Sequence, residues 1–405
     1  MRSKNPFFTV LIIGAVMVML SGCSMEDSME ELGRLMGLVP AAESYYEESV
    51  NEGTIIEEET AEPEAIDPAE IEFETSEPSE PAEPEPDITT VTVSATGDCA
   101  IGRVHIHGYN LSFEDYYDRN GPDYFMKNVR EIFREDDFTL INCECTLTNE
   151  TVHVDKEYCI KGYPEYVQIL SGSSVEGATL GNNHNADYGE QSLVDTEETL
   201  DGAGIQYALN DHYGIYETES GIRIGFVSVS MLGDFPTRSS YMETGLTALR
   251  DQVDILIACP HMGIERENYA NSNQVAFFRQ CVDWGADLVV GNHPHVLQGM
   301  EVYKGKVIAY SLGNFCFGAN HNPSDYDTVI LQQTFTFVDG ELQNQINARI
   351  IPCSVSSEKN NNNYQPTPYE EAEDIDRVIT KMNDFSKGLG DIYFDADGAL
   401  RPRLD

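Results

Sequence analysis

Basic residues are scarce in this chain. It has 24 lysines and arginines against 70 aspartates and glutamates in 405 residues, a formal net charge of −46 at pH 7. Nucleic-acid binding relies on a basic surface that neutralises phosphates, so this composition excludes nucleic acid as a partner. The length leaves room for one large domain or two small ones.

A long hydrophobic run is also missing. The most apolar N-terminal stretch, residues 7–20, is short for a transmembrane helix. It follows two basic residues and ends at Cys23 in a Leu-Ser-Gly-Cys sequence, so residues 1–23 have the pattern of a secretory signal. This ending resembles a bacterial lipobox, in which the cysteine is lipidated and becomes the first mature residue. We therefore expect an extracytoplasmic protein with a lipid anchor in the bacterial cell membrane; an uncleaved membrane anchor is the alternative.

Paired cysteine motifs are nearly absent. No second Cys-x-Cys or Cys-x-x-Cys accompanies Cys143 and Cys145, which excludes a zinc knuckle. Without Cys23 eight cysteines remain, an even number that permits disulfides outside the cytoplasm. Cys259 and Cys316 lie in apolar strands, where buried free thiols are equally expected.

Composition divides the chain into a linker and a folded part. Residues 24–87 are rich in glutamate and proline, bury too little apolar area to fold, and repel one another. We expect them to form a disordered acidic linker between the membrane and a folded domain at residues 88–355. Residues 356–405 are expected to be a loop and a helix packed on that domain.

Short apolar segments alternate with helical patterns from residue 88 onward. Strands are predicted at residues 89–95, 138–142, 175–180, 222–230, 253–259 and 288–290. Helices are predicted at residues 123–133, 191–203, 274–284 and 369–382, and hairpins at Lys304-Gly305 and Asp339-Gly340. This order predicts an α/β domain with a largely parallel sheet. The later strands, which have no helices between them, are expected to form a second sheet packed on the first.

Side chains that can bind metal or transfer protons follow five of these strands. They are Asp98, Glu144, Asn183 with His184, His261, and His293 with His295. In open α/β sheets, ligands bind at the carboxyl ends of the strands. A mixture of carboxylates, amides and imidazoles suits Zn, Mn or Fe better than Ca or Mg. The set exceeds the needs of one tetrahedral ion, so it predicts two divalent ions that share a carboxylate. Taken alone, His293-Pro294-His295 also fits a polar loop.

Six short motifs in this order resemble a known family. They are Gly97-Asp98, Asn142-x-Glu144, Asn182-Asn183-His184-x-x-Asp187-Tyr188-Gly189, His261-x-Gly263, Gly291-x-His293-Pro294-His295 and Tyr310-Ser311-Leu312-Gly313-Asn314-Phe315. They look like those of the CapA family, the poly-γ-glutamate (capsule) synthesis proteins also called PgsA, which resemble calcineurin-like metallophosphoesterases. The resemblance covers residues 91–317. It implies a metallophosphoesterase-like four-layer α/β/β/α sandwich with two mixed sheets.

The resemblance also implies a role for each site residue. The implied metal ligands are Asp98 and His295 for a first ion, Asn183, His261 and His293 for a second, and Glu144 between them. His184 would protonate the leaving oxygen or stabilise charge, which suits an imidazole near neutral pH. Asp187 would orient His184 as a supporting carboxylate, or else cap a helix.

The chain departs from the family pattern beside the first ion. Metallophosphoesterases usually place a histidine two residues after the first aspartate, where this chain has Ala100. His105 and His107 are candidates to replace that ligand, although lone histidines usually meet structural needs. Arg103 would meet an anionic group of the substrate or form a surface salt bridge. Asn314, in the expected pocket wall, is a candidate substrate contact.

Three functions compete at this point. The resemblance implies a cell-surface lipoprotein of poly-γ-glutamate synthesis or export, working with membrane-bound polyglutamate synthase or export components and carrying a phosphoesterase-like metal site. The second is a metal-dependent phosphatase or phosphodiesterase for an extracellular phosphate ester unrelated to capsule. The third is a non-catalytic binding module of the cell envelope.

Overall fold

Apolar segments of the chain form two mixed β-sheets. The structure is a computed structural model that describes residues 85–403. The expected signal (1–23) with Cys23, and nearly all of the expected linker (24–87), lie outside these residues. Within residues 85–403, no helix combines the length and apolarity needed to cross a membrane.

The first sheet has nine strands built around β1 (Ile88–Ala100). On one side, β1 is followed by three parallel strands: β3 (Phe138–Cys143), β6 (Gly177–Thr179) and β7 (Gln206–Ala208). On the other side lie antiparallel strands β15 (Asp327–Val338), β17 (Ala348–Ser354) and β18 (Thr367–Pro368), with β16 (Glu341–Leu342) on β15. The last residues of β1 pair instead with β14 (Asn314–Phe317), which runs parallel to it.

The second sheet has six strands. Its order is β12 (Met300–Tyr303), β13 (Lys306–Ala309), β11 (Leu288–Val290), β10 (Ile255–His261), β9 (Arg223–Ser230) and β8 (Gly214–Glu217). The four central strands are parallel, and the two edge strands are antiparallel to their neighbours. Because β10 and β11 are parallel, their carboxyl ends lie at one edge of the sheet.

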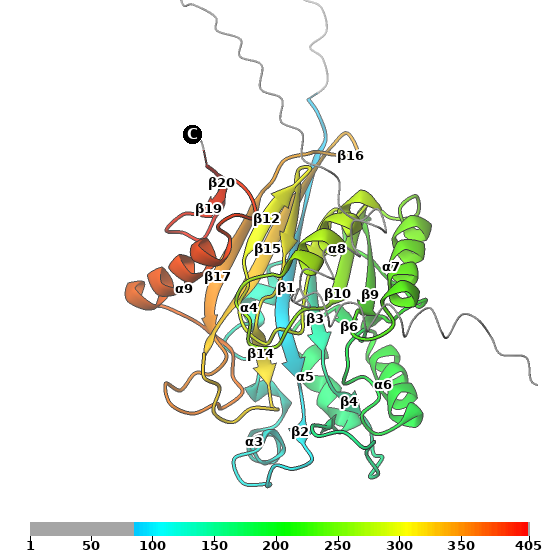
Figure 1. Cartoon of the computed structure of the whole chain (residues 1–405), viewed down its shortest axis with the longest axis vertical. Coiled ribbons are helices and arrows are strands. Elements are labelled where there is room, and N and C mark those ends of the chain that lie inside the picture. The colour runs from blue at the N-terminus through cyan, green and yellow to red at the C-terminus, as the bar shows by residue number, and fades with distance from the viewer. Residues whose placement is uncertain (1–84, 404–405) are drawn as a thin grey trace, which may run out of the picture. The chain divides into compact units, whose positions relative to one another are not determined.

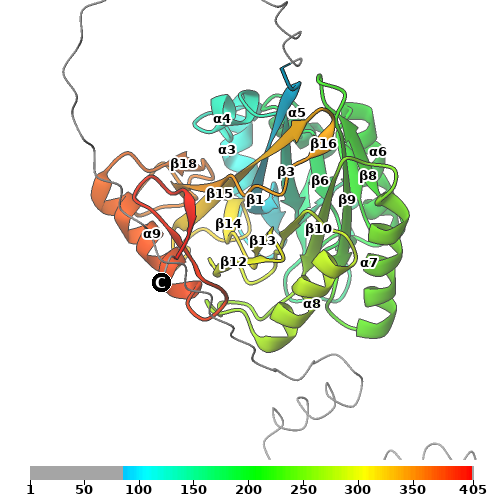
Figure 2. The same ribbon diagram turned by 90° about the horizontal axis from the view of Figure 1, so that it is seen from above.

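Helices cover the outer faces of both sheets, so the domain has four layers (Figures 1 and 2). On the first sheet lie α3 (Phe113–Asn120), α4 (Arg130–Arg134), α5 (Val167–Ser171) and α6 (Glu190–Ala203); on the second lie α7 (Phe235–Leu249) and α8 (Ser272–Asp283). Three buried apolar clusters separate the layers. One lies between the first four helices and their sheet, one between the sheets, and one beneath α7 and α8. The expected four-layer α/β/β/α sandwich with two mixed sheets is thus confirmed.

Local sequence signals explain several of these elements. The capping box of Asn271 and Gln274 begins α8, and Gly204 ends α6 in the left-handed conformation. The predicted hairpin turn at Lys304-Gly305 is confirmed, with φ of 48° and 77° at the two residues. Two successive positive φ values are typical of the tight turn that matches the twist of paired strands.

Two expectations about the elements are wrong, and one helix was not predicted. The helix predicted at residues 123–133 is only a 3-10 turn, η1 (Pro122–Tyr124), and the short α4. Helix α7 was not predicted, because Pro236 and polar residues occupy its first turns. The late strands β14 to β18 do not form a second sheet. They join the first sheet through β14 and β15, which pair with β1. The late strands β12 and β13 do belong to the second sheet, which comes from residues 214–309.

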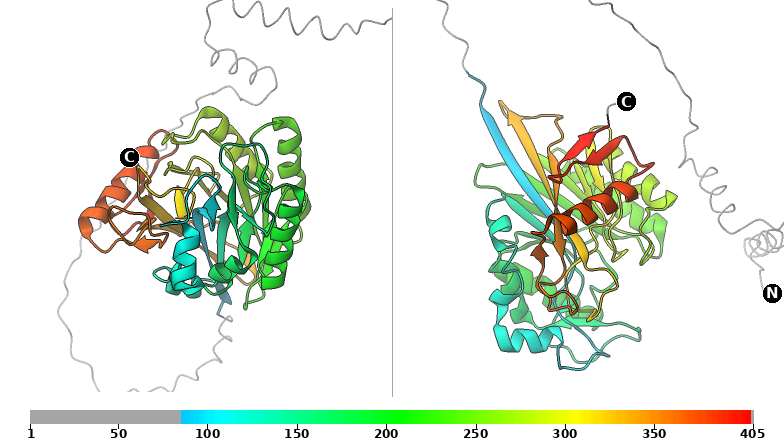
Figure 3. Two further views of the ribbon diagram at one scale, coloured as in Figure 1. Left: turned by 90° about the horizontal axis from the view of Figure 1, so that it is seen from below. Right: turned by 90° about the vertical axis from the view of Figure 1, so that its left-hand side faces the viewer.

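The C-terminal residues lie against the sheets' shared core. Helix α9 (Ala372–Phe385) contributes Val378 and Met382 to the cluster between the sheets, and the pair β19 (Ile392–Phe394) and β20 (Leu400–Pro402) follows it (Figure 3). Buried Asp327 holds the helix through an ion pair with Lys381, Nζ to Oδ2 2.6 Å.

A small three-stranded sheet lies apart from the two large ones. It consists of β2 (Arg103–Val104), β5 (Ile160–Gly162) and β4 (Thr146–Leu147).

Each of the eight cysteines in the described part of the chain is a buried free thiol, so the disulfide alternative fails there.

Candidate metal centre

The carboxyl ends of strands from both sheets deliver the predicted side chains. Asp98 lies near the end of β1, Glu144 directly follows β3, His261 ends β10, and His293 and His295 follow β11. The amide of Asp98 donates to the carbonyl oxygen of Gly313 over 2.8 Å. A Cβ atom on Gly97 would lie 1.9 Å from that oxygen, so only glycine allows this close approach of β1 to the turn before β14.

The ligand atoms gather in two groups that share one carboxylate. Atoms of Asp98, Glu144 and His295 lie within 4.8 Å of one another, and so do atoms of Glu144, His261 and His293. Glu144 Oε1 lies 3.6 Å from Nε2 of His261 and 3.7 Å from Nε2 of His295. The geometry therefore fits two ions with Glu144 between them.

Unsatisfied buried atoms test whether these residues suit metal ions. Asp98 Oδ2, Glu144 Oε1 and His293 Nδ1 are buried and make no aligned hydrogen bond. His295 Nδ1 lies 3.0 Å from both Asp98 Oδ2 and Asn314 Oδ1, and it meets the hydrogen-bond geometry only toward Asn314. Each buried polar atom without a hydrogen bond lowers the stability of a folded protein by about 1–3 kcal/mol. Divalent cations would satisfy all three, so the residues fit the implied metals.

The electrostatics also favour a cation. Burial raises the pKa of Glu144 well above its usual value, and the charge of Asp98 adds to this. Burial lowers the pKa of His261 far below its usual value and that of His293 to about 4. Neutral imidazole is the form that binds metal, so both rings already have a free lone pair.

One histidine of the cluster behaves differently. Burial would lower the pKa of His295, but the carboxylates of Glu144 and Asp98 raise it to about 10. The same contact holds the pKa of Asp98 well below its usual range, although burial alone would raise it. In the protein without metal, the proton on His295 thus supplies part of the positive charge that the carboxylates demand.

Backbone strain is concentrated at the two histidines after β11. His293 has φ of 104° and His295 has φ of 57°. Non-glycine residues in such conformations cost about 1–3 kcal/mol each and cluster at functional sites. This loop brings both rings close to the same carboxylate, that of Glu144.

His184 lies in a separate hydrogen-bonded group beside this cluster. Asn183 Oδ1 is 2.7 Å from Nε2 of His261, and the neighbouring His184 Nδ1 is 2.6 Å from Asp187 Oδ2. Asp187 also accepts from the amide of Ile160 over 2.7 Å. The N-cap of α6 is Gly189, so the alternative of Asp187 as a helix cap is wrong.

Comparison with known proteins agrees with the motifs. The family model described as "Bacterial capsule synthesis protein PGA_cap" matches residues 92–319, more than half of the chain. The chain belongs to this family. The match spans the second sheet, part of the first sheet and every candidate metal ligand named above.

Three curated relatives each match a little more than half of the chain. The "PGA biosynthesis protein CapA" of Bacillus subtilis is 32% identical over 56% of this chain and 63% of its own length. The "Capsule biosynthesis protein CapA" of Bacillus anthracis is 28% identical over 56% and 60%. A "Probable polyglutamine synthesis accessory protein" of Mycobacterium tuberculosis is 26% identical over 54% and 66%. The chain thus spans less than two thirds of the length of these relatives.

A solved structure, that of TT1561 from Thermus thermophilus, also resembles the domain. The TM-score is 0.37 at 10% sequence identity, covering 60% of this chain and 94% of that one.

In the described part of the chain, no histidine near Ala100 takes the place of the ligand that the family pattern expects there. Ala100 is fully buried in the apolar cluster beneath the outer helices. His107 lies against His321, with ring centroids 4.6 Å apart, and His105 lies against His153, with centroids 4.1 Å apart. Among the residues the structure describes, neither joins the ligand groups of Asp98, so neither replaces the missing histidine.

The two predicted substrate contacts are differently placed. Arg103 Nε lies 2.9 Å from Glu114 Oε2, which is the salt bridge weighed as the alternative, and its Nη1 donates to the carbonyl of His107 over 2.6 Å. Arg103 also lines a cavity of about 260 Å³ together with Lys161. Asn314 contacts His295 and so orients its ring.

Sequence reasoning missed three residues of the site. Lys156 Nζ lies 3.0 Å from Asp187 Oδ1 and 3.1 Å from His184 Nδ1. Asn142, noted only as part of a motif, donates to Asp98 Oδ1 over 2.8 Å. Exposed Glu265 has a carboxylate within reach of both His293 and His295. Lys156 and Glu265 come from irregular loops, where no strand end marks them.

Proposed function

We propose that this family member acts at the bacterial cell surface in poly-γ-glutamate synthesis or export, and that its metal centre hydrolyses a phosphate ester. The names of the Bacillus relatives support the pathway. The chemistry rests on one observation, the two ligand groups that share Glu144 and leave buried ligand atoms unsatisfied. Lipidation of Cys23 would place the domain beside membrane-bound synthase or export components.

The protein side chains divide into ligands and proton carriers. Asp98 and His295 would hold one ion, Asn183, His261 and His293 the other, and Glu144 both. Two Mn, Zn or Fe ions held by these residues would supply a nucleophile at neutral pH and neutralise charge on a phosphate. Asn142 and Asn314 keep Asp98 and His295 in place through the hydrogen bonds described above.

His184 would exchange a proton with the substrate. Its Nδ1 is held by Asp187, which leaves Nε2 as the free ring nitrogen. Burial lowers the pKa of His184, while the carboxylate of Asp187 raises it and the ammonium of Lys156 lowers it. The resting ring is therefore neutral near pH 7. An anionic substrate would stabilise the imidazolium and prepare it to protonate a leaving oxygen.

Metal content and hydrolysis of a simple diester test the chemistry. The purified full chain should contain close to two transition-metal ions and hydrolyse bis(p-nitrophenyl) phosphate. Glu144→Gln removes the shared charge and should abolish both properties. Glu219→Gln, an exposed carboxylate in the turn after β8, is the matched control and should leave both unchanged. A metal-free protein, or equal hydrolysis by the Glu144 variant, refutes a catalytic centre.

Polymer yield separates the pathway from the alternatives. A deletion strain complemented with the Glu144→Gln variant should make little surface polyglutamate. The same strain complemented with the Glu219→Gln variant should make the normal amount. Normal polymer with lost hydrolysis favours the unrelated phosphatase. Restored polymer with no hydrolysis in any form of the protein favours the binding module.

The membrane anchor needs its own test, because Cys23 lies outside the described residues. Cys23→Ala should move the protein from the membrane fraction to the soluble extracellular fraction. Retention of the variant in membranes would favour an uncleaved anchor.

A further inference from the structure

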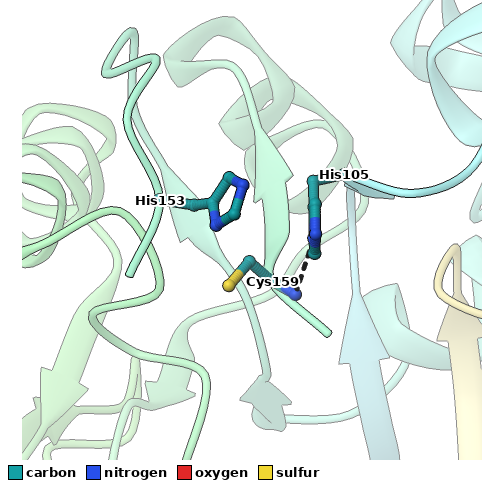
Figure 4. Close-up of side chains that lie close together, drawn as sticks. All are labelled: His105, His153 and Cys159. Carbon is teal, nitrogen blue, oxygen red and sulfur yellow. Dashed lines mark hydrogen bonds between the residues drawn. The ribbon is translucent and has the colours of Figure 1, made fainter. Parts of the chain in front are cut away.

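A second group of metal-capable side chains lies in the small sheet (Figure 4). Strands β2 and β5 pair Val104 with Ile160, and the amide of His105 continues the ladder by donating to the carbonyl of Cys159 over 3.0 Å. His105 and Cys159 are thus directly opposite each other on paired strands. His153 reaches them from the loop of residues 148–159, and its ring lies against that of His105 with the centroids 4.1 Å apart and the ring planes tilted by 35°.

The three side chains present ligand atoms to a common point. One ring nitrogen from each histidine and the sulfur of Cys159 lie within 4.8 Å of one another. In Figure 4 the two rings stand side by side, with the sulfur below them on the side of His153. Two imidazoles and a thiolate suit zinc and other borderline or soft ions, and they do not suit Mg or Ca.

Hydrogen bonds set which lone pairs are available. His153 Nδ1 lies 2.7 Å from the carbonyl oxygen of Val154 and donates to it, which leaves Nε2 unprotonated for a metal. His105 Nδ1 accepts the amide of Cys159 over 3.2 Å, so its lone pair also faces the group. A metal would take this lone pair in place of the long hydrogen bond. The buried thiol donates weakly to Val154 and would lose its proton on binding.

We propose that His105, His153 and Cys159 bind one zinc-class ion that clamps the loop of residues 148–159 onto β2 and β5. Both histidines line the 260 Å³ cavity next to Arg103 and Lys161, so a fourth coordination position faces that space. The site shares no ligand with the metal centre. A failure of the proposed function would therefore leave metal binding at this site untouched, and the reverse also holds.

The loop connects this metal site to the proposed catalytic residues His184 and Asp187. Between His153 and Cys159 it carries Lys156, whose ammonium contacts Asp187 and His184. The amide of Val154 donates to the carbonyl of Asp187 over 2.9 Å. An ion that fixes both ends of residues 153–159 would therefore hold Lys156 against Asp187.

Cobalt provides a spectroscopic test on the purified full chain. The metal centre offers only nitrogen and oxygen ligands, so a thiolate-to-cobalt charge-transfer band on Co²⁺ addition reports this group alone. The band should vanish in Cys159→Ala and persist in Cys281→Ala, a buried thiol in α8. His153 is exposed, so His153→Ala should fold normally and weaken Zn²⁺ binding at this site by at least about tenfold. His212→Ala is its matched control.

The outcomes distinguish metal binding at this site from its effect on the loop of residues 148–159. No charge-transfer band, or a band unchanged in Cys159→Ala, overturns the site. Zn²⁺ should also slow amide hydrogen exchange in residues 148–159 of the native chain but not in His153→Ala. Zinc binding without that protection overturns the clamp and keeps the site. Loss of hydrolysis in Glu144→Gln with an intact cobalt–thiolate band is expected, because the two sites are separate.

Discussion

Replacing Asp187 by asparagine should destabilise the domain by about 2–4 kcal/mol. The carboxylate is 1% exposed and accepts from the amide of Ile160, from Lys156 Nζ and from His184 Nδ1. An asparagine must turn its NH₂ group toward at least one of these donors, whichever way the amide is oriented.

The magnitude follows from the contacts that are lost. Hydrogen bonds to a charged group contribute about 1.5–3 kcal/mol each, and removing one partner of a buried ion pair costs about 3–5 kcal/mol. The side chain of Lys156 is 31% exposed, so water replaces part of its interaction and lowers the total. The two remaining donors, Ile160 and His184, are buried and have no such substitute.

Urea unfolding measures this effect. The single tryptophan, Trp284, lies at the end of α8 within the domain, so its fluorescence reports domain unfolding. Exposed Asp201→Asn on α6 is the matched control and should change the free energy of unfolding by less than about 0.5 kcal/mol. A loss below about 1 kcal/mol in Asp187→Asn would refute a buried charged network at this residue.

Three further predictions concern packing and pH. Gly97→Ala should cost about 3 kcal/mol or more, because its Cβ would overlap the carbonyl of Gly313; an unchanged urea midpoint would contradict that close approach. Phe278→Ala should cost about 3–5 kcal/mol, because the fully buried ring stacks on Tyr310 at 5.1 Å; Val194→Ala, exposed on α6, should cost far less. Burial raises the pKa of Asp136 and of Glu176 to about 7, from ordinary values of 3.8 and 4.5. The folded state then binds more protons than the unfolded state between about pH 4 and pH 7, so stability falls as pH rises through this window. Asp136→Asn should flatten that decline in urea midpoints measured from about pH 4 to pH 8, and an identical slope would show that the carboxyl is not responsible.

Much of the site was predictable because strand ends have local signals. An apolar run that stops at a glycine and a polar side chain is visible in sequence, and parallel strands carry such ends to one edge of a sheet. This reasoning predicted Asp98, Glu144, His261, His293 and His295 as neighbours, and their ligand atoms do lie together. Their roles in metal binding and catalysis stay predictions until they are measured.

Loop residues could not be found in this way. Lys156 and His153 come from a segment without periodicity. Lys156 contacts His184, 28 residues away in sequence, and His153 contacts His105, 48 residues away. The contact of Arg103 with Glu114 was weighed only as an alternative, since a guanidinium near a site suits a substrate as well as a carboxylate. Helix α7 was missed because its buried residues lie in its second half.

The spacing of the strands and the polar residues at their ends were enough to predict the α/β class and the residues of the candidate metal centre. These two features depend on local patterns and on the rule that parallel strands place their ends together. The four layers were implied only by the resemblance to the CapA family. Only the tertiary structure decided which strands share a sheet, because pairing of β15 with β1 joins residues more than 200 positions apart. It also decided the partners of Lys156, His105 and Cys159, because loop positions depend on packing against distant elements and have no periodic signal in the sequence.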